Sequence, residues 1–211
     1  MEINEARFVI SNSDARRCPT PTLPEYAFIG RSNVGKSSLI NMLCNHSHLA
    51  KVSGTPGKTQ LINHFLINKN WYLVDLPGYG YAKVGKRLKA TFTTIINHYL
   101  TQRSNLQCLF ILIDSRLAPQ KIDLEFMREM GKKQIPFTLI FTKADKLKPQ
   151  ALQDNIKHYA DVMLQEWEEM PHFFISSSSH KTGKEEILQY IDELNANWVL
   201  PPREEKHDLG Q

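Results

Sequence analysis

Cysteine is scarce in this sequence, and its placement excludes two common structural roles. The 211 residues include three cysteines, at positions 18, 44 and 108. They form no C-x-x-C pair and no zinc-binding spacing, and an odd number does not suit a disulfide framework. We therefore expect reduced thiols in a cytoplasmic protein and no structural metal site.

Long apolar runs and targeting signals are also missing. The longest apolar runs, such as LFILI at 109–113, have the length of a strand and are too short to span a membrane. The first residues, MEINEARFVI, contain no basic region followed by a long apolar one, and the last, HDLGQ, form no lipidation motif. The sequence thus predicts neither export nor a membrane partner.

The charges nearly balance, and the chain length limits the number of domains. The formal net charge of +4 favours a polyanionic partner such as nucleic acid only weakly. With 41% hydrophobic residues, a chain of 211 residues can bury one full core and is short for two. We expect one domain over residues 24–198, an extension over residues 1–23 and a polar tail over residues 199–211. We also expect a monomer.

Strand-like and helix-like segments alternate along the chain. Short β-branched and aromatic runs indicate strands, whereas apolar residues at helical spacing indicate helices. The expected strands are 26–29, 61–68, 71–76, 108–114, 137–142 and 172–176, and the expected helices are 36–45, 87–103, 121–133, 151–169 and 183–198. This order predicts a three-layer α/β fold with helices on both faces of a mainly parallel sheet. Only Lys69 and Asn70 separate two strands, so that pair should form a hairpin with one reversed strand.

The segment GRSNVGKS at 30–37 fits the phosphate-loop pattern G-x-x-x-x-G-K-[ST] and lies between a predicted strand and a predicted helix. Gly30 and Gly35 let the backbone wrap closely around phosphates at the positive end of the helix. Lys36 can reach the β- and γ-phosphates, and the Ser37 hydroxyl can bind Mg²⁺. Further nucleotide contacts are expected from Arg31, Ser32, Asn33, Val34 and Ser38.

Two later segments indicate that the base is guanine. TKAD at 142–145 follows a predicted strand, and Asp145 can accept hydrogen bonds from guanine N1–H and the 2-amino group, which adenine does not offer. Lys143 can lie over the base or the ribose, and Ala144 completes the contact. Thr142 stands where this motif usually has asparagine, so base recognition on the N7 side would be weaker. In ISSSSHKTG, we expect backbone N–H groups of Ser176, Ser177 and Ser178 to face guanine O6.

Two segments between these motifs are expected to sense the γ-phosphate. KVSGTPGKTQ at 51–60 has the composition of a mobile loop. Thr55 and Thr59 are both candidates to complete the Mg²⁺ shell, and we choose Thr59 because it lies closer to the next strand; a plain flexible loop is the alternative. In DLPGYG, Asp75 would hold Mg²⁺ through a water and the Gly78 amide would contact the γ-phosphate. Further nucleotide contacts are expected from Gly57, Lys58, Gln60, Leu61, Leu76 and Pro77.

With these motifs in order, the sequence resembles the EngB (YsxC/YihA-type) GTPases, a family of bacterial ribosome-biogenesis factors. The resemblance covers roughly residues 5–198 and rests on GRSNVGKSSLIN, TPGKTQLIN, VDLPGYGYAKV, LIDSR, TKADKL and the serine-rich loop. Thr142 matches the family's own TKxD form. The resemblance implies a P-loop NTPase fold (Ras-like G domain), hydrolysis of GTP to GDP, and Ser37 and Thr59 as Mg²⁺ ligands. It further implies a role in large ribosomal subunit maturation and in normal cell division and septation.

Tyr79 follows the sensor glycine where related GTPases usually have a glutamine that orients the attacking water. An aromatic ring cannot replace that glutamine and should turn away from the γ-phosphate. Asn33 could instead help hold a potassium ion against the phosphates, as in other GTPases that lack the glutamine, or it could merely stabilise the loop turn. A group supplied by a partner is a second route. Intrinsic hydrolysis should therefore be slow.

A basic run follows Tyr79 and leaves two interpretations open. Lys83, Lys86, Arg87 and Lys89 could contact RNA in a nucleotide-dependent way, or they could form the solvated first turn of a helix. Two other functions are also compatible with a phosphate loop. An ATP-dependent small-molecule kinase is disfavoured by Asp145, and a membrane-associated trafficking GTPase is disfavoured by the lack of a lipidation motif.

Overall fold

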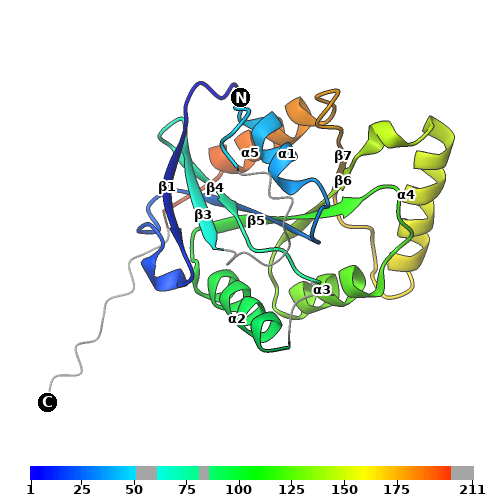
Figure 1. Cartoon of the computed structure of the whole chain (residues 1–211), viewed down its shortest axis with the longest axis horizontal. Helices are drawn as coiled ribbons and strands as arrows, with labels where there is room; N and C mark the ends of the chain where they lie inside the picture. The colour runs from blue at the N-terminus through cyan, green and yellow to red at the C-terminus, as the bar shows by residue number, and fades with distance from the viewer. Residues whose placement is uncertain (51–60, 81–85, 201–211) are drawn as a thin grey trace, which may run out of the picture.

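A single mixed sheet organises the protein. The computed structural model describes residues 1–50, 61–80 and 86–200, and for residues 86–90 and 92 it describes the backbone alone. Within these residues the sheet has seven strands in the order β1-β3-β4-β2-β5-β6-β7 (Figure 1). The strands are β1 (Ala6–Asn12), β2 (Glu25–Gly30), β3 (Ile62–Ile67), β4 (Trp71–Asp75), β5 (Leu106–Asp114), β6 (Phe137–Thr142) and β7 (Phe173–Ile175).

Among these strands β3 alone runs against the others. It pairs antiparallel with both β1 and β4, whereas β4, β2, β5, β6 and β7 pair parallel to one another. The turn between β3 and β4 places Asn68 and Lys69 at φ angles of 46° and 61°, the left-handed conformation that tight hairpins require. The predicted hairpin and the single reversed strand are confirmed.

Strand β1 was not predicted, because residues 1–23 were expected to form an extension. It pairs with β3 from Ala6 to Asn12, with an irregularity between Phe8 and Ile10. The residues before it are also bound to the sheet, since Asn68 Oδ1 accepts hydrogen bonds from the backbone N–H groups of Asn4 (2.9 Å) and Glu5 (3.1 Å). The start of the described chain is therefore part of the sheet.

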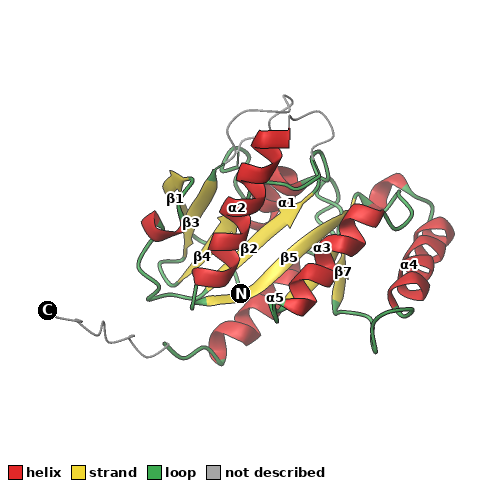
Figure 2. Ribbon diagram, turned by 90° about the horizontal axis from the view of Figure 1, so that it is seen from below, coloured by secondary structure: helices red, strands yellow, loops and turns green. Residues whose placement is uncertain are grey.

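Helices cover both faces of the sheet, as predicted. Alternate side chains of β2 point to opposite faces, and from Tyr26 to Ile29 both sets are apolar and fully buried. Helices α1 (Lys36–Leu43) and α5 (Lys184–Ala196) cover one face, and α2 (Lys86–Gln102), α3 (Lys121–Lys132) and α4 (Pro149–Met163) cover the other (Figures 1 and 2). Helix α4 ends six residues before the predicted 169, because turn hydrogen bonds follow Met163. No helix in the described part of the chain is both long and apolar enough to cross a membrane.

A buried polar network joins three elements where β2 begins. Glu25 is fully buried and accepts hydrogen bonds from Tyr99 Oη (2.7 Å), His64 Nε2 (3.2 Å) and the Arg103 guanidinium (3.1 Å from Nε, with a second contact from Nη2). Burial acts to raise the pKa of Glu25, but the hydrogen bonds from His64 and Arg103 outweigh it and lower the pKa to about 2. Arg103 also donates to Pro19 O (2.7 Å), which ties the segment after β1 to α2.

Candidate functional site

Four of the loops singled out in the sequence meet at one edge of the sheet. They follow β2, β4, β6 and β7, four strands that run in the same direction, so their carboxyl ends lie together. Leu61, Leu76 and Pro77 lie at the same edge, next to β3 and β4. The remaining expected contacts, Thr55, Gly57, Lys58, Thr59 and Gln60, and the basic Lys83, lie outside the described residues.

The phosphate loop connects β2 directly to α1. Gly35 is the residue before the helix and has a φ angle of +103°, which an L side chain rarely adopts. Asn33 is also left-handed, at φ 63°. Gly30 has no room for a side chain, since a Cβ atom there would lie 2.9 Å from Leu112 O. The loop therefore curls tightly, as a backbone cradle for an anion at a helix N-terminus does.

Lys36 and Asp75 contact each other at this edge. The Nζ atom of Lys36 donates to Asp75 Oδ1, and both side chains are largely buried, with 16% and 13% of their surfaces exposed. Burial lowers the pKa of Lys36 to about 7, while the adjacent carboxylate favours the charged form. Ser37 follows in the first turn of α1, so a hydroxyl, an ammonium and a carboxylate lie in one small region.

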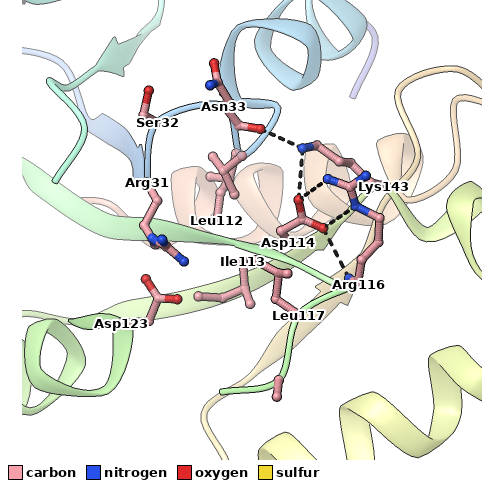
Figure 3. A pocket seen from close by; sticks show the side chains of 12 residues that line it. Arg31, Ser32, Asn33, Leu112, Ile113, Asp114, Arg116, Leu117, Asp123 and Lys143 are labelled. Carbon is pink, nitrogen blue, oxygen red and sulfur yellow. Dashed lines mark hydrogen bonds and ion pairs between the residues drawn. The ribbon is translucent and has the colours of Figure 1, made fainter. Parts of the chain in front are cut away.

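Thr142 and Lys143 brace the phosphate loop from the side of β6. Thr142 is 4% exposed, and its Oγ1 lies 2.6 Å from Val34 O and 3.1 Å from Ile113 O. Lys143 Nζ donates to Asn33 O (2.6 Å) and to Asp114 Oδ2 (2.9 Å), as Figure 3 shows. The Thr142 hydroxyl therefore faces the phosphate loop, and the expected weaker base recognition on the N7 side stays a prediction.

Asp114 and Arg116 complete this brace and were not identified as site residues from the sequence. Arg116 donates to both oxygens of Asp114, at 2.8 Å and 2.7 Å. Burial acts to raise the pKa of Asp114, but the hydrogen bonds from Arg116 and Lys143 lower it to about 2. The feature of the sequence that could have identified Asp114 is its position at the end of a predicted buried strand.

Asp145 is held by the serine-rich loop. Its Oδ1 accepts a hydrogen bond from Ser177 Oγ (2.7 Å), and its Oδ2 lies 3.0 Å from Lys146 Nζ. The hydrogen bond from Ser177, followed by that from Lys146, lowers the pKa of Asp145. The carboxylate is therefore ionised and fixed, as an acceptor for two parallel donors must be.

The structure corrects the expected role of the serine N–H groups. The Ser176 N–H donates to Phe141 O (2.8 Å) and the Ser177 N–H donates to Thr182 O (3.2 Å), so both are engaged within the protein. Of the three N–H groups predicted to face guanine O6, Ser178 alone makes no hydrogen bond within the described residues. A cavity of about 660 Å³ opens between this loop and α1; Ser38, Asn41, Met42, Asn45, His46, Ser47, Ser178, Ser179 and Lys181 line it.

Tyr79 packs against α3. Its N–H donates to Gly30 O (3.2 Å), which aligns the sensor segment with the start of the phosphate loop. Its ring stacks on Phe126 with centroids 4.4 Å apart and planes 14° from parallel. This position agrees with the expectation that the ring turns away from the phosphates.

Comparisons with known proteins identify the family. A family model described as "50S ribosome-binding GTPase" matches residues 25–143. A "Probable GTP-binding protein EngB" of Bacteroides thetaiotaomicron is 61% identical over 92% of this chain and 96% of its own length, and one of Christiangramia forsetii is 60% identical over 92% and 98%. This chain belongs to the EngB family of GTP-binding proteins. The predicted family is thereby confirmed.

Solved structures agree with membership of the EngB family. A crystal structure of a probable EngB protein superposes with a TM-score of 0.66 at 25% identity, over 82% of this chain and 99% of that one. Era of Aquifex aeolicus superposes with a TM-score of 0.64 at 19% identity, over 87% and 58%, which concerns the fold alone. The predicted P-loop GTPase fold is confirmed.

Proposed function

We propose that this EngB-family chain binds GTP and GDP, hydrolyses GTP to GDP and phosphate, and acts as a nucleotide switch in large ribosomal subunit assembly. The observation that carries the proposal is the fixed, ionised Asp145 at the same edge of the sheet as the phosphate loop. The same edge of the sheet can thus engage both a guanine base and its phosphates. The role in ribosome assembly extends to normal cell division and septation, in a monomeric, cytoplasmic protein.

Asp145 supports guanine rather than adenine nucleotides. Its carboxylate oxygens suit the N1–H and 2-amino donors of guanine, whereas adenine offers no such pair of donors. The same argument disfavours the small-molecule kinase. The preference for guanine is tested by letting GDP or ADP compete with a fluorescent guanine nucleotide for the protein. Equal competition by GDP and ADP would contradict the proposal.

The residues present fit magnesium. Ser37 offers a hydroxyl oxygen and Asp75 a carboxylate, the oxygen ligands that Mg²⁺ prefers, and Lys36 brings Asp75 next to the first turn of α1. When bound, magnesium neutralises charge on the β- and γ-phosphates. We propose Ser37 as a direct ligand, Asp75 as a ligand through water, and Thr59 as the ligand that depends on the γ-phosphate. In this arrangement Lys36 exchanges Asp75 for the β- and γ-phosphates.

Hydrolysis by this chain has to proceed without a glutamine after Gly78. The Tyr79 ring packs on Phe126, so it is turned toward α3 rather than the phosphate loop. We propose that positive charge comes either from potassium held with the help of Asn33 or from a group of the partner. The left-handed backbone of Asn33 is equally compatible with a role in the loop turn. A faster GTP turnover in potassium than in sodium supports the first route, and equal rates exclude it.

The ribosomal role rests on the family. The matching family model is described as ribosome-binding, and the relatives carry the EngB name without naming a partner. Co-sedimentation with large ribosomal subunits in a GTP analogue, in GDP and without nucleotide tests it. Binding to subunits in none of these conditions would contradict the role, and binding to membranes instead would favour a trafficking GTPase.

The basic residues at the start of α2 are the proposed RNA contact. Lys86, Arg87 and Lys89 lie in its first turn, directly after the segment that carries Lys83. Replacing Lys86 and Arg87 by Glu should weaken binding to ribosomal particles and should make that binding less dependent on the salt concentration. The exposed Lys157 of α4, replaced in the same way, is the control. Unchanged binding in the double variant would leave these residues as a solvated helix turn.

A further inference from the structure

Three polar side chains from separate elements meet behind the phosphate loop. Arg31 follows β2, Tyr79 follows the sensor glycine, and Asp123 lies in the first turn of α3. Arg31 and Asp123 face each other across a cavity of about 170 Å³ (Figure 3). Asp123 is 4% exposed, and within the described residues its Oδ1, the Arg31 Nε and the Tyr79 hydroxyl make no hydrogen bond.

This cluster is attached to the segment that would sense the γ-phosphate. Tyr79 directly follows Gly78, stacks on Phe126 and bonds through its N–H to Gly30 O. A Cβ atom at Gly80 would lie 2.9 Å from Ile122 Cδ1, so the chain presses against α3 at this residue as well. The position of α3 therefore fixes the backbone on the carboxyl side of Gly78.

The charges of the cluster are coupled. Burial raises the pKa of Asp123 to about 6, while Tyr79 and Arg31 act in the opposite direction. Burial and then the Asp123 carboxylate raise the pKa of Tyr79, and both also raise that of Tyr159 on α4. At neutral pH the carboxylate is ionised and buried at a cost in stability, which a residue that served packing alone would avoid.

We propose that Asp123 is a positioning residue for the γ-phosphate sensor: through Tyr79 and Arg31 it holds the Gly78 backbone where a terminal phosphate would meet it. The inference rests on the proposed GTP binding and adds a residue of α3 to it. Because Gly78 would contact the γ-phosphate and not the phosphates of GDP, Asp123 contributes to the preference for GTP over GDP. A residue that only packs would affect both nucleotides alike.

The test compares the affinities of a non-hydrolysable GTP analogue and of GDP in Asp123→Asn, which keeps the shape and removes the charge. The GTP analogue should bind about five- to tenfold more weakly, because the charge that orients Arg31 and Tyr79 is removed, with GDP affinity unchanged. The melting temperature should not fall, since a buried ionised carboxylate is removed. Glu125→Gln, an exposed change on the same helix, is the matched control and should alter neither affinity.

Tyr79→Phe and a pH series test the coupling. Tyr79→Phe keeps the ring and should weaken the GTP analogue as Asp123→Asn does, with no added effect in the double variant. As the pH falls through about 6, Asp123 becomes protonated, so the wild type should lose its preference for the GTP analogue over GDP. Asp123→Asn should not show this loss. Titration of the nucleotide phosphates affects both proteins alike and cancels in the comparison. The other charged and titratable groups near Asp123 are the same in the two proteins. They are Arg31, Tyr79 and Tyr159, which face Asp123, and Asp114, Arg116 and Lys143, which line the same cavity.

Two outcomes overturn the inference and are distinguishable. If the wild type binds both nucleotides and Asp123→Asn leaves their affinity ratio unchanged at all pH values, Asp123 has a packing role and the proposed function stands. If the wild type binds neither nucleotide, the proposed function fails and the inference with it.

Discussion

The carboxylate proposed to recognise guanine depends on a serine from another loop. Ser177 Oγ donates to Asp145 at 2.7 Å and also lies 3.1 Å from Ser179 Oγ, while the His180 N–H donates to it at 3.2 Å. These contacts fix the hydroxyl, and the hydroxyl fixes the carboxylate. The proposed base recognition therefore depends on two loops rather than on the K-x-D motif alone.

Ser177→Ala should weaken the binding of GDP about tenfold or more, because a hydrogen bond to a charged group, which contributes about 1.5–3 kcal/mol, is lost. The pKa of Asp145 should move back toward its ordinary value, so affinity at acid pH should be lost at a higher pH than in the wild type. Titration calorimetry at pH 7 measures the first effect, and its extension below the ordinary aspartate pKa measures the second. Ser104→Ala, at an exposed serine, is the control, and equal affinities for the two variants would contradict the role of Ser177.

Thr142 should affect both nucleotides equally. Thr142→Val keeps the shape and removes the hydroxyl, so the carbonyl of Val34 loses a buried partner at 2.6 Å. We expect a loss of about 1–3 kcal/mol in unfolding free energy and weaker binding of GDP and of a GTP analogue by the same factor. Urea unfolding and nucleotide titration measure these. A variant that loses affinity for the GTP analogue alone would indicate a role beyond bracing the phosphate loop.

The sequence could predict which segments carry the site, because Gly30, Gly35 and Lys36 have side-chain and backbone requirements that few other functions share. It could not predict which N–H groups of the serine loop are available. That depends on the partners of Ser176 and Ser177, Phe141 O and Thr182 O, which only the fold determines. For the same reason, no pattern in the sequence indicated that Arg31 and Asp123, which are far apart in the chain, face each other.

Among the helices and strands, periodicity predicted those that are buried on one or both faces. Strand β1 was missed because it lies at the edge of the sheet, where Arg7, Phe8 and Val9 are exposed and no regular alternation results. The end of α4 was placed too late, because the apolar spacing continues past Met163 while the backbone turns. For β1 the pairing with β3 decided the structure, and for α4 the turn hydrogen bonds after Met163 did.

The network around Glu25 predicts a large difference between two arginine variants. Arg103→Met leaves a fully buried carboxylate without its main counter-charge and should cost about 3–5 kcal/mol of unfolding free energy. Arg128→Met removes an equally well-formed pair with Glu166, at 2.7 Å and 2.6 Å, but that pair is exposed and should cost less than about 1 kcal/mol. Chemical unfolding at pH 7 measures both, and similar losses would contradict the assignment.

The same network gives the stability a pH dependence. The pKa of Glu25 is lowered in the folded protein to about 2, so its contribution is fully present above the ordinary glutamate pKa and is lost as the pH falls from about 4.5 to about 2. The shift corresponds to about 3 kcal/mol. Glu25→Gln should be less stable than the wild type at pH 7 and should lose less on acidification. Parallel pH profiles would show that other carboxylates dominate.

Across the whole molecule, the two ends of the sheet have different tasks. The loops of the candidate site extend from the carboxyl ends of β2, β4, β6 and β7, whereas the Glu25 network closes the opposite end of β2. Helix α2 runs from the edge with the site, at Lys86, to the network, beside Arg103, so the network anchors the far end of the helix that carries the proposed RNA contact. Strand β1 contributes to neither end and protects the edge of the sheet.

Deleting residues 1–12 should therefore separate stability from nucleotide binding. The deletion exposes the backbone groups of β3, which would then be an edge able to pair with another chain. We expect a lower melting temperature and concentration-dependent association in size-exclusion chromatography. GDP binding should be retained below the melting transition, because none of the described site residues lies in residues 1–12. Phe8→Ser, which removes a half-exposed ring but keeps the strand pairing, is the control and should remain monomeric.

A deletion variant as stable and as monomeric as this control would mean that β1 is not needed to cover β3. Loss of GDP binding in a folded deletion variant would mean that β1 also supports the site.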